Sequence, residues 1–83
     1  MTLTLKANEI LDVPAARRLL ELATEAQPNI PIVLDFREVK EAQDAALGLI
    51  VFSLEQTAHE VSYVGLGSHQ RRVVEYLGGI RPE

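Results

Sequence analysis

Hydrophobic and polar positions along the chain follow two periods, one typical of strands and one typical of helices. Residues 3–5 (LTL) alternate apolar and polar side chains, and residues 61–66 (VSYVGL) are mostly apolar, so both segments predict strands. Residues 30–36 (IPIVLDF) are almost continuously apolar, which is typical of a strand covered on both faces of an α/β sheet. The pattern therefore predicts three strands.

Two helices are predicted between these strands. The first spans residues 13–26, where apolar side chains recur with helical spacing behind Asp12, a typical N-cap residue. The second spans residues 44–58 and is predicted to begin with Asp44 as its N-cap. Gly48 lowers helix propensity inside the second helix, which predicts a close approach to a neighbouring backbone.

A third helix is predicted over residues 69–77, with Ser68 as its cap and Gly78 just beyond its last turn. Its spacing places three side chains on the inner side, namely Val73, Val74 and Leu77. The resulting β-α-β-α-β-α order predicts one α/β domain over residues 1–83, with right-handed crossovers and a mainly parallel sheet.

Composition excludes several classes of function. The 83 residues include no cysteine, so disulfides, thiolate catalysis and cysteine-ligated zinc are ruled out. The net charge of −4 argues against nucleic-acid binding, because Arg17-Arg18 and Arg71-Arg72 each lie near a glutamate. No apolar run reaches the roughly 20 residues that span a bilayer, so no membrane insertion is expected and the predicted location is cytoplasmic.

No catalytic residue, metal site or cofactor is predicted from the titratable groups. His59 and His69 are ten residues apart, without a metal-ligand spacing. A magnesium site would require several carboxylates to gather at one end of the sheet. The candidates are Glu9, Asp12, Asp35 and Asp44. Because two of them are explained as helix caps, the chain is interpreted as a binding module and not as an enzyme.

Gly65 and Gly67 form a G-x-G motif between a predicted strand and a predicted helix, which is the position of a dinucleotide-binding turn. Gln70 stands where the third glycine of that motif belongs. Two interpretations follow. Gly65, Gly67 and Ser68 either bind a nucleotide or form a tight turn capped by Ser68.

Several segments, taken in order, resemble the STAS domain family (sulphate transporter and anti-sigma factor antagonist). Residues 8–13 (NEILDV) resemble its "G-E-L-D-V" entry, and residues 32–36 (IVLDF) its "V-V-L-D-L" strand. Residues 44–48 (DAALG) fall where the family carries "D-S-S-G-L-G". Residues 61–67 resemble its next strand and residues 71–79 its closing helix.

The resemblance implies a STAS-like fold and a regulatory role. Small STAS proteins dock onto partners; anti-sigma factor antagonists bind an ATP-dependent kinase that otherwise holds a sigma factor. An anti-sigma factor kinase is therefore the expected partner, and the alternative is an accessory subunit of a transporter ATPase or signalling scaffold. The chain is short at both ends for this family, which predicts an exposed sheet edge and makes a homodimer an expected option.

The family's phosphorylated serine or threonine is missing here. Depending on the alignment, Asp44 or Ala45 takes the acceptor position, and these imitate the phosphorylated and unphosphorylated states respectively. We expect a fixed recognition surface formed by Asp44, Ala45, Ala46, Leu47 and Gly48, with the loops at 8–12 and 37–43 beside it. The alternative is that the two alanines are only good helix formers after a cap.

Overall fold

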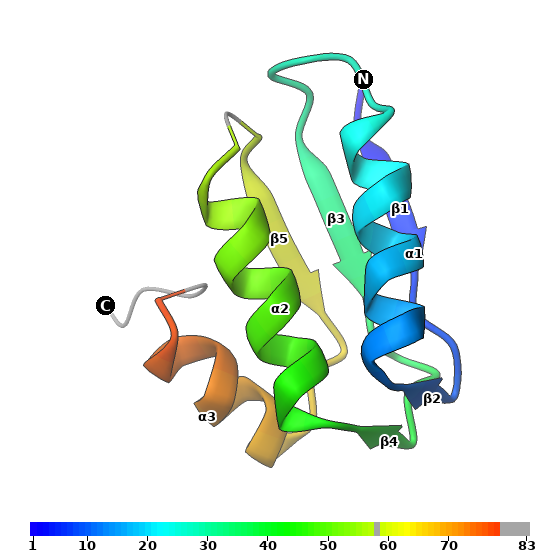
Figure 1. Cartoon of the computed structure of the whole chain (residues 1–83), viewed down its shortest axis with the longest axis vertical. Coiled ribbons are helices and arrows are strands. Elements are labelled where there is room, and N and C mark those ends of the chain that lie inside the picture. Colours follow the sequence, from blue (N-terminus) through cyan, green and yellow to red (C-terminus); the bar gives the residue numbers. More distant parts are fainter. Residues whose placement is uncertain (58, 79–83) are drawn as a thin grey trace.

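The computed structural model describes residues 1–57 and 59–78, and it is an α/β fold with three helices and a small parallel sheet. The helices and strands are shown in Figure 1. In chain order they are β1 (Leu3–Lys6), β2 (Ile10–Leu11), α1 (Val13–Thr24), β3 (Ile32–Asp35), β4 (Glu41–Ala42), α2 (Asp44–Glu55), β5 (Val61–Val64) and α3 (Ser68–Tyr76).

Strands β1, β3 and β5 form one parallel sheet in that order, which confirms the predicted alternation of strands and helices. Leu5 pairs with Leu34, and Leu34 pairs with Tyr63, so apolar side chains from the three strands share one row. Within the described residues, β1 and β5 each pair on one side only. The sheet therefore has two open edges in this part of the chain.

Two further strands were not predicted. β2 and β4 have two residues each and pair in parallel, with Ile10 opposite Glu41 and Leu11 opposite Ala42. The backbone N–H of Gln43 also donates to the Leu11 carbonyl, at 3.0 Å. This short ladder links the segment before α1 to the segment before α2.

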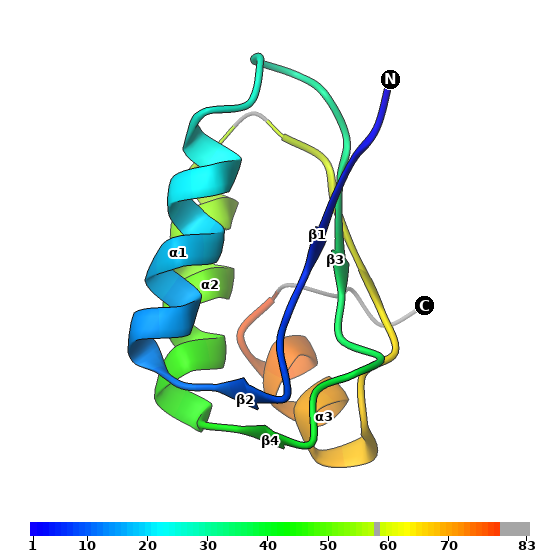
Figure 2. The ribbon, with the colours of Figure 1, turned by 90° about the vertical axis from the view of Figure 1, so that its right-hand side faces the viewer.

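Helices α1 and α2 lie side by side on one face of the sheet (Figure 2). Ile32 and Leu34 point to this face and are buried, whereas Val33 on the opposite face is only half-buried. Asp35 on that opposite face is covered by the Arg37 side chain rather than by a helix. The prediction that this strand is covered on both faces therefore holds for the helical face and only in part for the other, where Asp35 is buried but Val33 is half-buried.

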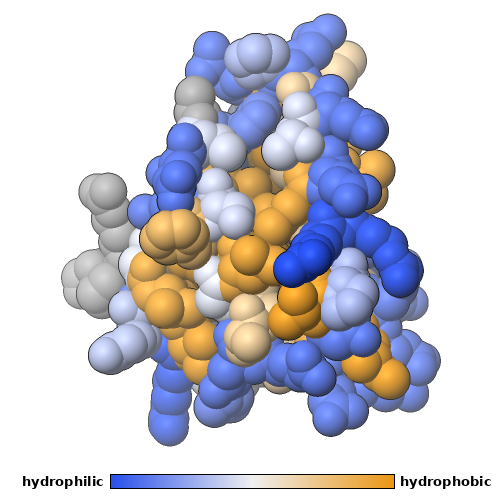
Figure 3. All heavy atoms as spheres, viewed as in Figure 1, coloured by the Kyte–Doolittle hydropathy of each residue, from blue (hydrophilic) through white to orange (hydrophobic). Residues whose placement is uncertain are grey.

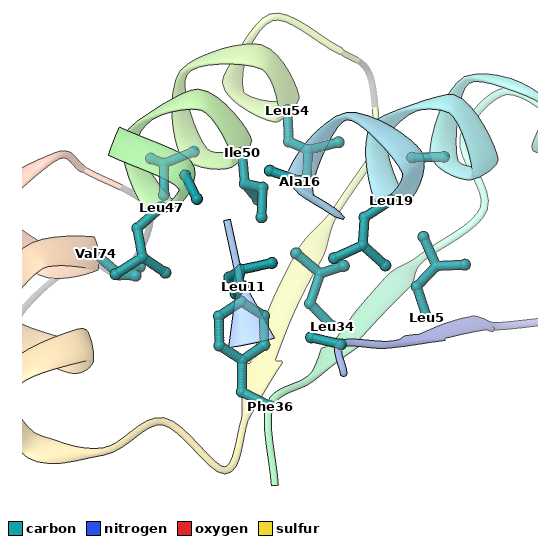
Figure 4. Packing of buried hydrophobic residues seen from close by; sticks show 14 of the residues in the cluster. Leu5, Leu11, Ala16, Leu19, Leu34, Phe36, Leu47, Ile50, Leu54 and Val74 are labelled. Atoms are coloured by element: carbon teal, nitrogen blue, oxygen red, sulfur yellow. The ribbon is translucent and has the colours of Figure 1, made fainter. Parts of the chain in front are cut away.

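The core fills the space between the two helices and the sheet (Figure 4). Leu11, Leu34 and Phe36 are almost fully buried there, and the Phe36 ring meets Tyr63 edge to face with centroids 6.3 Å apart. Helix α3 packs against α2 and contributes Val74 to the core. Leu77, which was predicted to face inward, is the C-cap residue of α3 and is 41% exposed.

Helix termini agree with the prediction in part. Asp12 caps α1, since its Oδ1 accepts from the backbone N–H of Ala15 at 2.9 Å, as predicted. Gly78 has a φ of +88°, which fits the predicted residue after the last turn of α3. Both α1 and α2 end before their predicted limits of 26 and 58, and Ala58 lies outside the described residues. Across the described chain, no helix has the length and apolar character needed to cross a membrane.

Candidate functional site

The start of α2, the first candidate site, is built differently from the prediction. The N-cap is Gln43, whose side chain makes no capping hydrogen bond, so the prediction that Asp44 is the N-cap was wrong. Asp44 is the first helical residue, and its Oδ1 lies 3.0 Å from Nε2 of His69. This contact joins the beginning of α2 to the beginning of α3, and so brings the two predicted site segments together.

The five residues predicted to form a recognition surface do not share one face. Asp44 and Ala45 are exposed and Gly48 is half-buried. Ala46 and Leu47, however, are 0% and 1% exposed and belong to the core. Helical periodicity explains the split, because these two residues align with the later inward positions of α2. The prediction that Ala46 and Leu47 are part of the surface was therefore wrong.

The outward side of α2 is apolar too, which was not predicted. Ala45, Gly48, Leu49 and Phe52 have i, i+3, i+4, i+7 spacing and form what we call the outer stripe. Phe52 is 70% exposed, and Ala45 is exposed as well. With its inner side in the core, α2 is apolar around its circumference from Ala45 to Phe52, which is typical of a helix covered on all sides. The continuous apolar run from 45 to 52 was the available sequence signal.

Apolar surface continues from the outer stripe onto both neighbouring helices. Between α2 and α3 lies a groove of about 500 Å³, which we call the α2–α3 groove. Its lining residues are Asp44, Gly48, His69, Arg72, Val73, Tyr76 and Leu77. On the other flank, Leu49 and Leu20 line a shallower hollow of about 250 Å³ beside α1. Figure 3 shows this apolar band over α2, bordered by strongly hydrophilic side chains on α1.

Gly48 does not serve the predicted close approach of backbones. A Cβ built on Gly48 would meet only the Leu77 Cδ1, at 3.9 Å, which is an ordinary van der Waals distance. That prediction was therefore wrong, and the missing side chain instead keeps the α2–α3 groove open.

The two loops predicted to flank the start of α2 do lie next to each other. Together they line an open hollow of about 750 Å³ that includes Asn8, Arg37 and Val39. Two of its lining residues pair with each other, since Lys40 Nζ lies 3.5 Å from Glu9 Oε1, and a third, Glu38, pairs through Oε2 with Nζ of the neighbouring Lys6 at 2.8 Å. Because these charged groups satisfy one another, the hollow offers a mixed polar surface and not a charged pocket.

The G-x-G turn has a structural explanation. Gly65 has a φ of +76°, and a Cβ there would lie 2.7 Å from the backbone nitrogen of Arg37. Gly67, not Ser68 as predicted, is the N-cap of α3, and its N–H donates to Oε1 of Gln70 at 3.0 Å. Backbone packing alone accounts for Gly65, and nucleotide binding at Gly65, Gly67 and Ser68 stays a prediction.

The four candidate carboxylates for a magnesium site are each engaged separately. Asp12 caps α1, Glu9 pairs with Lys40, Asp44 contacts His69, and Asp35 binds Arg37. In the part of the chain that the structure describes, no three His, Asp or Glu side chains are grouped so that they could hold a metal ion. His59 is also engaged, with Nδ1 2.8 Å from the Ile30 carbonyl oxygen.

Among the described residues, Asp35 is the carboxyl group whose pKa is clearly shifted. Arg37 donates to it from Nε and Nη2, at 3.0 and 2.8 Å, and from its backbone N–H, at 2.9 Å. The side-chain bonds first, and the backbone bond second, lower the pKa of Asp35 from 3.8 to about 2. A carboxylate held ionised in this way is a structural anchor for the loop after β3 and a poor proton donor near neutral pH.

The fold and site together define a small α/β domain with an apolar helical face, and among the described residues no three His, Asp or Glu side chains are grouped to hold a metal ion. Comparisons with protein-family models, with curated proteins and with solved structures find no match to this chain. The site therefore has to be interpreted from its own geometry.

Proposed function

We propose that the chain is a non-catalytic, STAS-like regulatory module that acts by binding a protein partner. One observation carries the proposal: the outer stripe of α2 is apolar and is exposed at Ala45 and Phe52, on a helix whose composition suits full burial. Contiguous apolar surface of this kind marks protein-binding sites on soluble domains. The docking face comprises Asp44, Ala45, Gly48, Leu49 and Phe52.

The resemblance to anti-sigma factor antagonists makes an anti-sigma factor kinase the proposed partner. Three parallel strands linked by two helices on one face are compatible with such a fold. No hydroxyl lies between residues 44 and 48, so the proposed module lacks the family's phosphorylation switch. Asp44 and Ala45 are both exposed, and either can occupy the acceptor position in the docked surface.

The test uses the tagged chain as bait in lysate of its native host, with bound proteins identified by mass spectrometry. Ala45→Glu places a charge in the docking face, at an exposed position outside the core. Gln27→Glu makes the same change of charge at an exposed position in the loop after α1. We expect a small kinase-like ATPase to bind the parent chain and the Gln27 variant and to be lost with Ala45→Glu.

Other results would favour a different function or contradict the proposed one. Recovery of a transporter ATPase would favour the accessory-subunit alternative. Unchanged partner binding by Ala45→Glu, with an unchanged urea midpoint of unfolding, would show that the docking face does not bind the partner. Saturable ATP binding by the isolated chain, with NMR shifts at Gly67 and Ser68, would favour the nucleotide-binding alternative instead.

A further inference from the structure

The α2–α3 groove, of about 500 Å³, has room for one large apolar side chain. Its floor is open because Gly48 has no side chain, and its walls include Val73 and Leu77. Tyr76 stands at its edge and is 91% exposed, and Leu77 is 41% exposed. An apolar group placed over Gly48 would remove water from both of these side chains.

The surroundings of α2 indicate which kind of element would cover it. The helix packs against α1 on one flank, α3 on the other and the sheet beneath, so within the described residues its outward side is the open one. The open strip from Ala45 to Phe52 is two turns long, about 10 Å. A further helix fits such a strip, because side chains of one helix insert between those of two neighbouring helices.

The charges on the groove rim indicate the polarity of the partner. Lys6, Arg37, Lys40 and Arg71 each form an ion pair with an acidic side chain. Arg72, on the rim, has no ion-pair partner within residues 1–57 and 59–78, and the same holds for Arg17 and Arg18 on α1, away from this groove. The acidic side chain of the same rim, Asp44, is already in contact with His69. A carboxylate supplied from outside would therefore complement Arg72.

We infer that the α2–α3 groove receives an amphipathic helix of the partner, with a large apolar side chain over Gly48 and a carboxylate facing Arg72. This inference rests on the proposed protein-binding function and adds the chemistry of the partner. The mixed flank beside α1, where Arg17 and Glu21 both line the hollow, does not select a charge. Recognition of charge is assigned to the α3 side alone.

A pair of synthetic helical peptides tests the inference without knowledge of the natural partner. Each has about 16 residues and the same Leu and Phe stripe, and the flanking residues are Glu in one peptide and Lys in the other. NMR titration of the labelled chain is expected to move the amide signals of Gly48, Phe52 and Val73. The Glu peptide should bind about tenfold more tightly than the Lys peptide.

Two variants and one control locate the effect. Arg72→Glu should reverse the preference between the peptides, and Arg18→Glu, at another exposed arginine, should leave it unchanged. Gly48→Met, which fills the groove with a good helix former, should weaken the Glu peptide at least tenfold. Equal binding of both peptides, binding that Arg72→Glu does not alter, or signals that move elsewhere would each overturn the inference.

Different results would contradict the proposed function and the inferred occupant of the groove. If the bait experiment recovers no partner but the Glu peptide binds the groove, the proposed function fails and the groove chemistry stands. If a partner binds through Ala45 but neither peptide binds, the inferred occupant is wrong and the docking function stands.

Discussion

At the scale of single residues, Gly65 is the most constrained position outside the core. Its φ of +76° would strain an alanine, and the alanine Cβ would lie only 2.7 Å from the Arg37 backbone nitrogen. We expect Gly65→Ala to lower the free energy of unfolding by about 2–4 kcal/mol, measured by urea denaturation. Gly78→Ala is the matched control, because its φ is +88° but its Cβ would meet no atom within 4 Å. It should cost about 1–2 kcal/mol, and equal losses would contradict the role of the Arg37 contact.

Asp35 provides a prediction about pH. Because its folded pKa of about 2 lies below the ordinary 3.8, its contribution to stability is complete above about pH 4 and is lost as pH falls towards 2. Asp35→Asn should therefore remove part of the acid dependence of unfolding between pH 4 and 2, measured by urea midpoints at each pH. Glu25→Gln, at an exposed position, is the control. Parallel curves for the parent chain and Asp35→Asn would contradict the proposed Arg37–Asp35 coupling.

At the scale of elements, one residue of α2, Gly48, lowers the helix propensity and can be replaced without a clash. Gly48 lies inside the helix, and a Cβ there would meet only Leu77 Cδ1, at 3.9 Å. We expect Gly48→Ala to stabilise the domain by up to about 1 kcal/mol in thermal or urea unfolding, because alanine has the higher helix propensity. A loss of stability would show that the space above Gly48 is used in the folded chain.

The existence of the three helices and of the three strands of the larger sheet could be predicted from the sequence, but their ends and exposed faces could not in every case. Asp12 was identified correctly, because a carboxylate before a proline and an amphipathic stripe has few other roles. Asp44 has the same local appearance, yet its partner is His69 of another helix. Leu77 has inward spacing, but it lines the open α2–α3 groove and stays 41% exposed. Both outcomes depend on how α2 and α3 lie beside each other, which the local sequence pattern does not show.

At the scale of the whole molecule, the chain has two unlike surfaces. The open face of the sheet presents Thr4, Lys6 and Ser62, all exposed, with the Asp35–Arg37 pair between them. The helical face presents the outer stripe and the α2–α3 groove. Strands β2 and β4 were not predictable, because two-residue strands have no periodicity and form only by pairing. Within residues 1–57 and 59–78, β1 and β5 each pair on one side only, and a homodimer stays a prediction.

The difference between the two surfaces gives a last prediction, about how the apolar helical face affects the stability and the column retention of the isolated chain. Phe52 and Tyr76 are 70% and 91% exposed, so replacing both with serine removes little buried surface and should change the free energy of unfolding by less than about 0.5 kcal/mol. Retention on a hydrophobic-interaction column should nevertheless fall, because the largest apolar side chains of that face are gone. Val64→Ser, at a 39% exposed position on the open sheet face, should change retention much less. Unaltered retention of the double variant would mean that the helical face is not the apolar surface that the domain presents, and a large loss of stability would mean that these side chains hold the helices together instead of awaiting a partner.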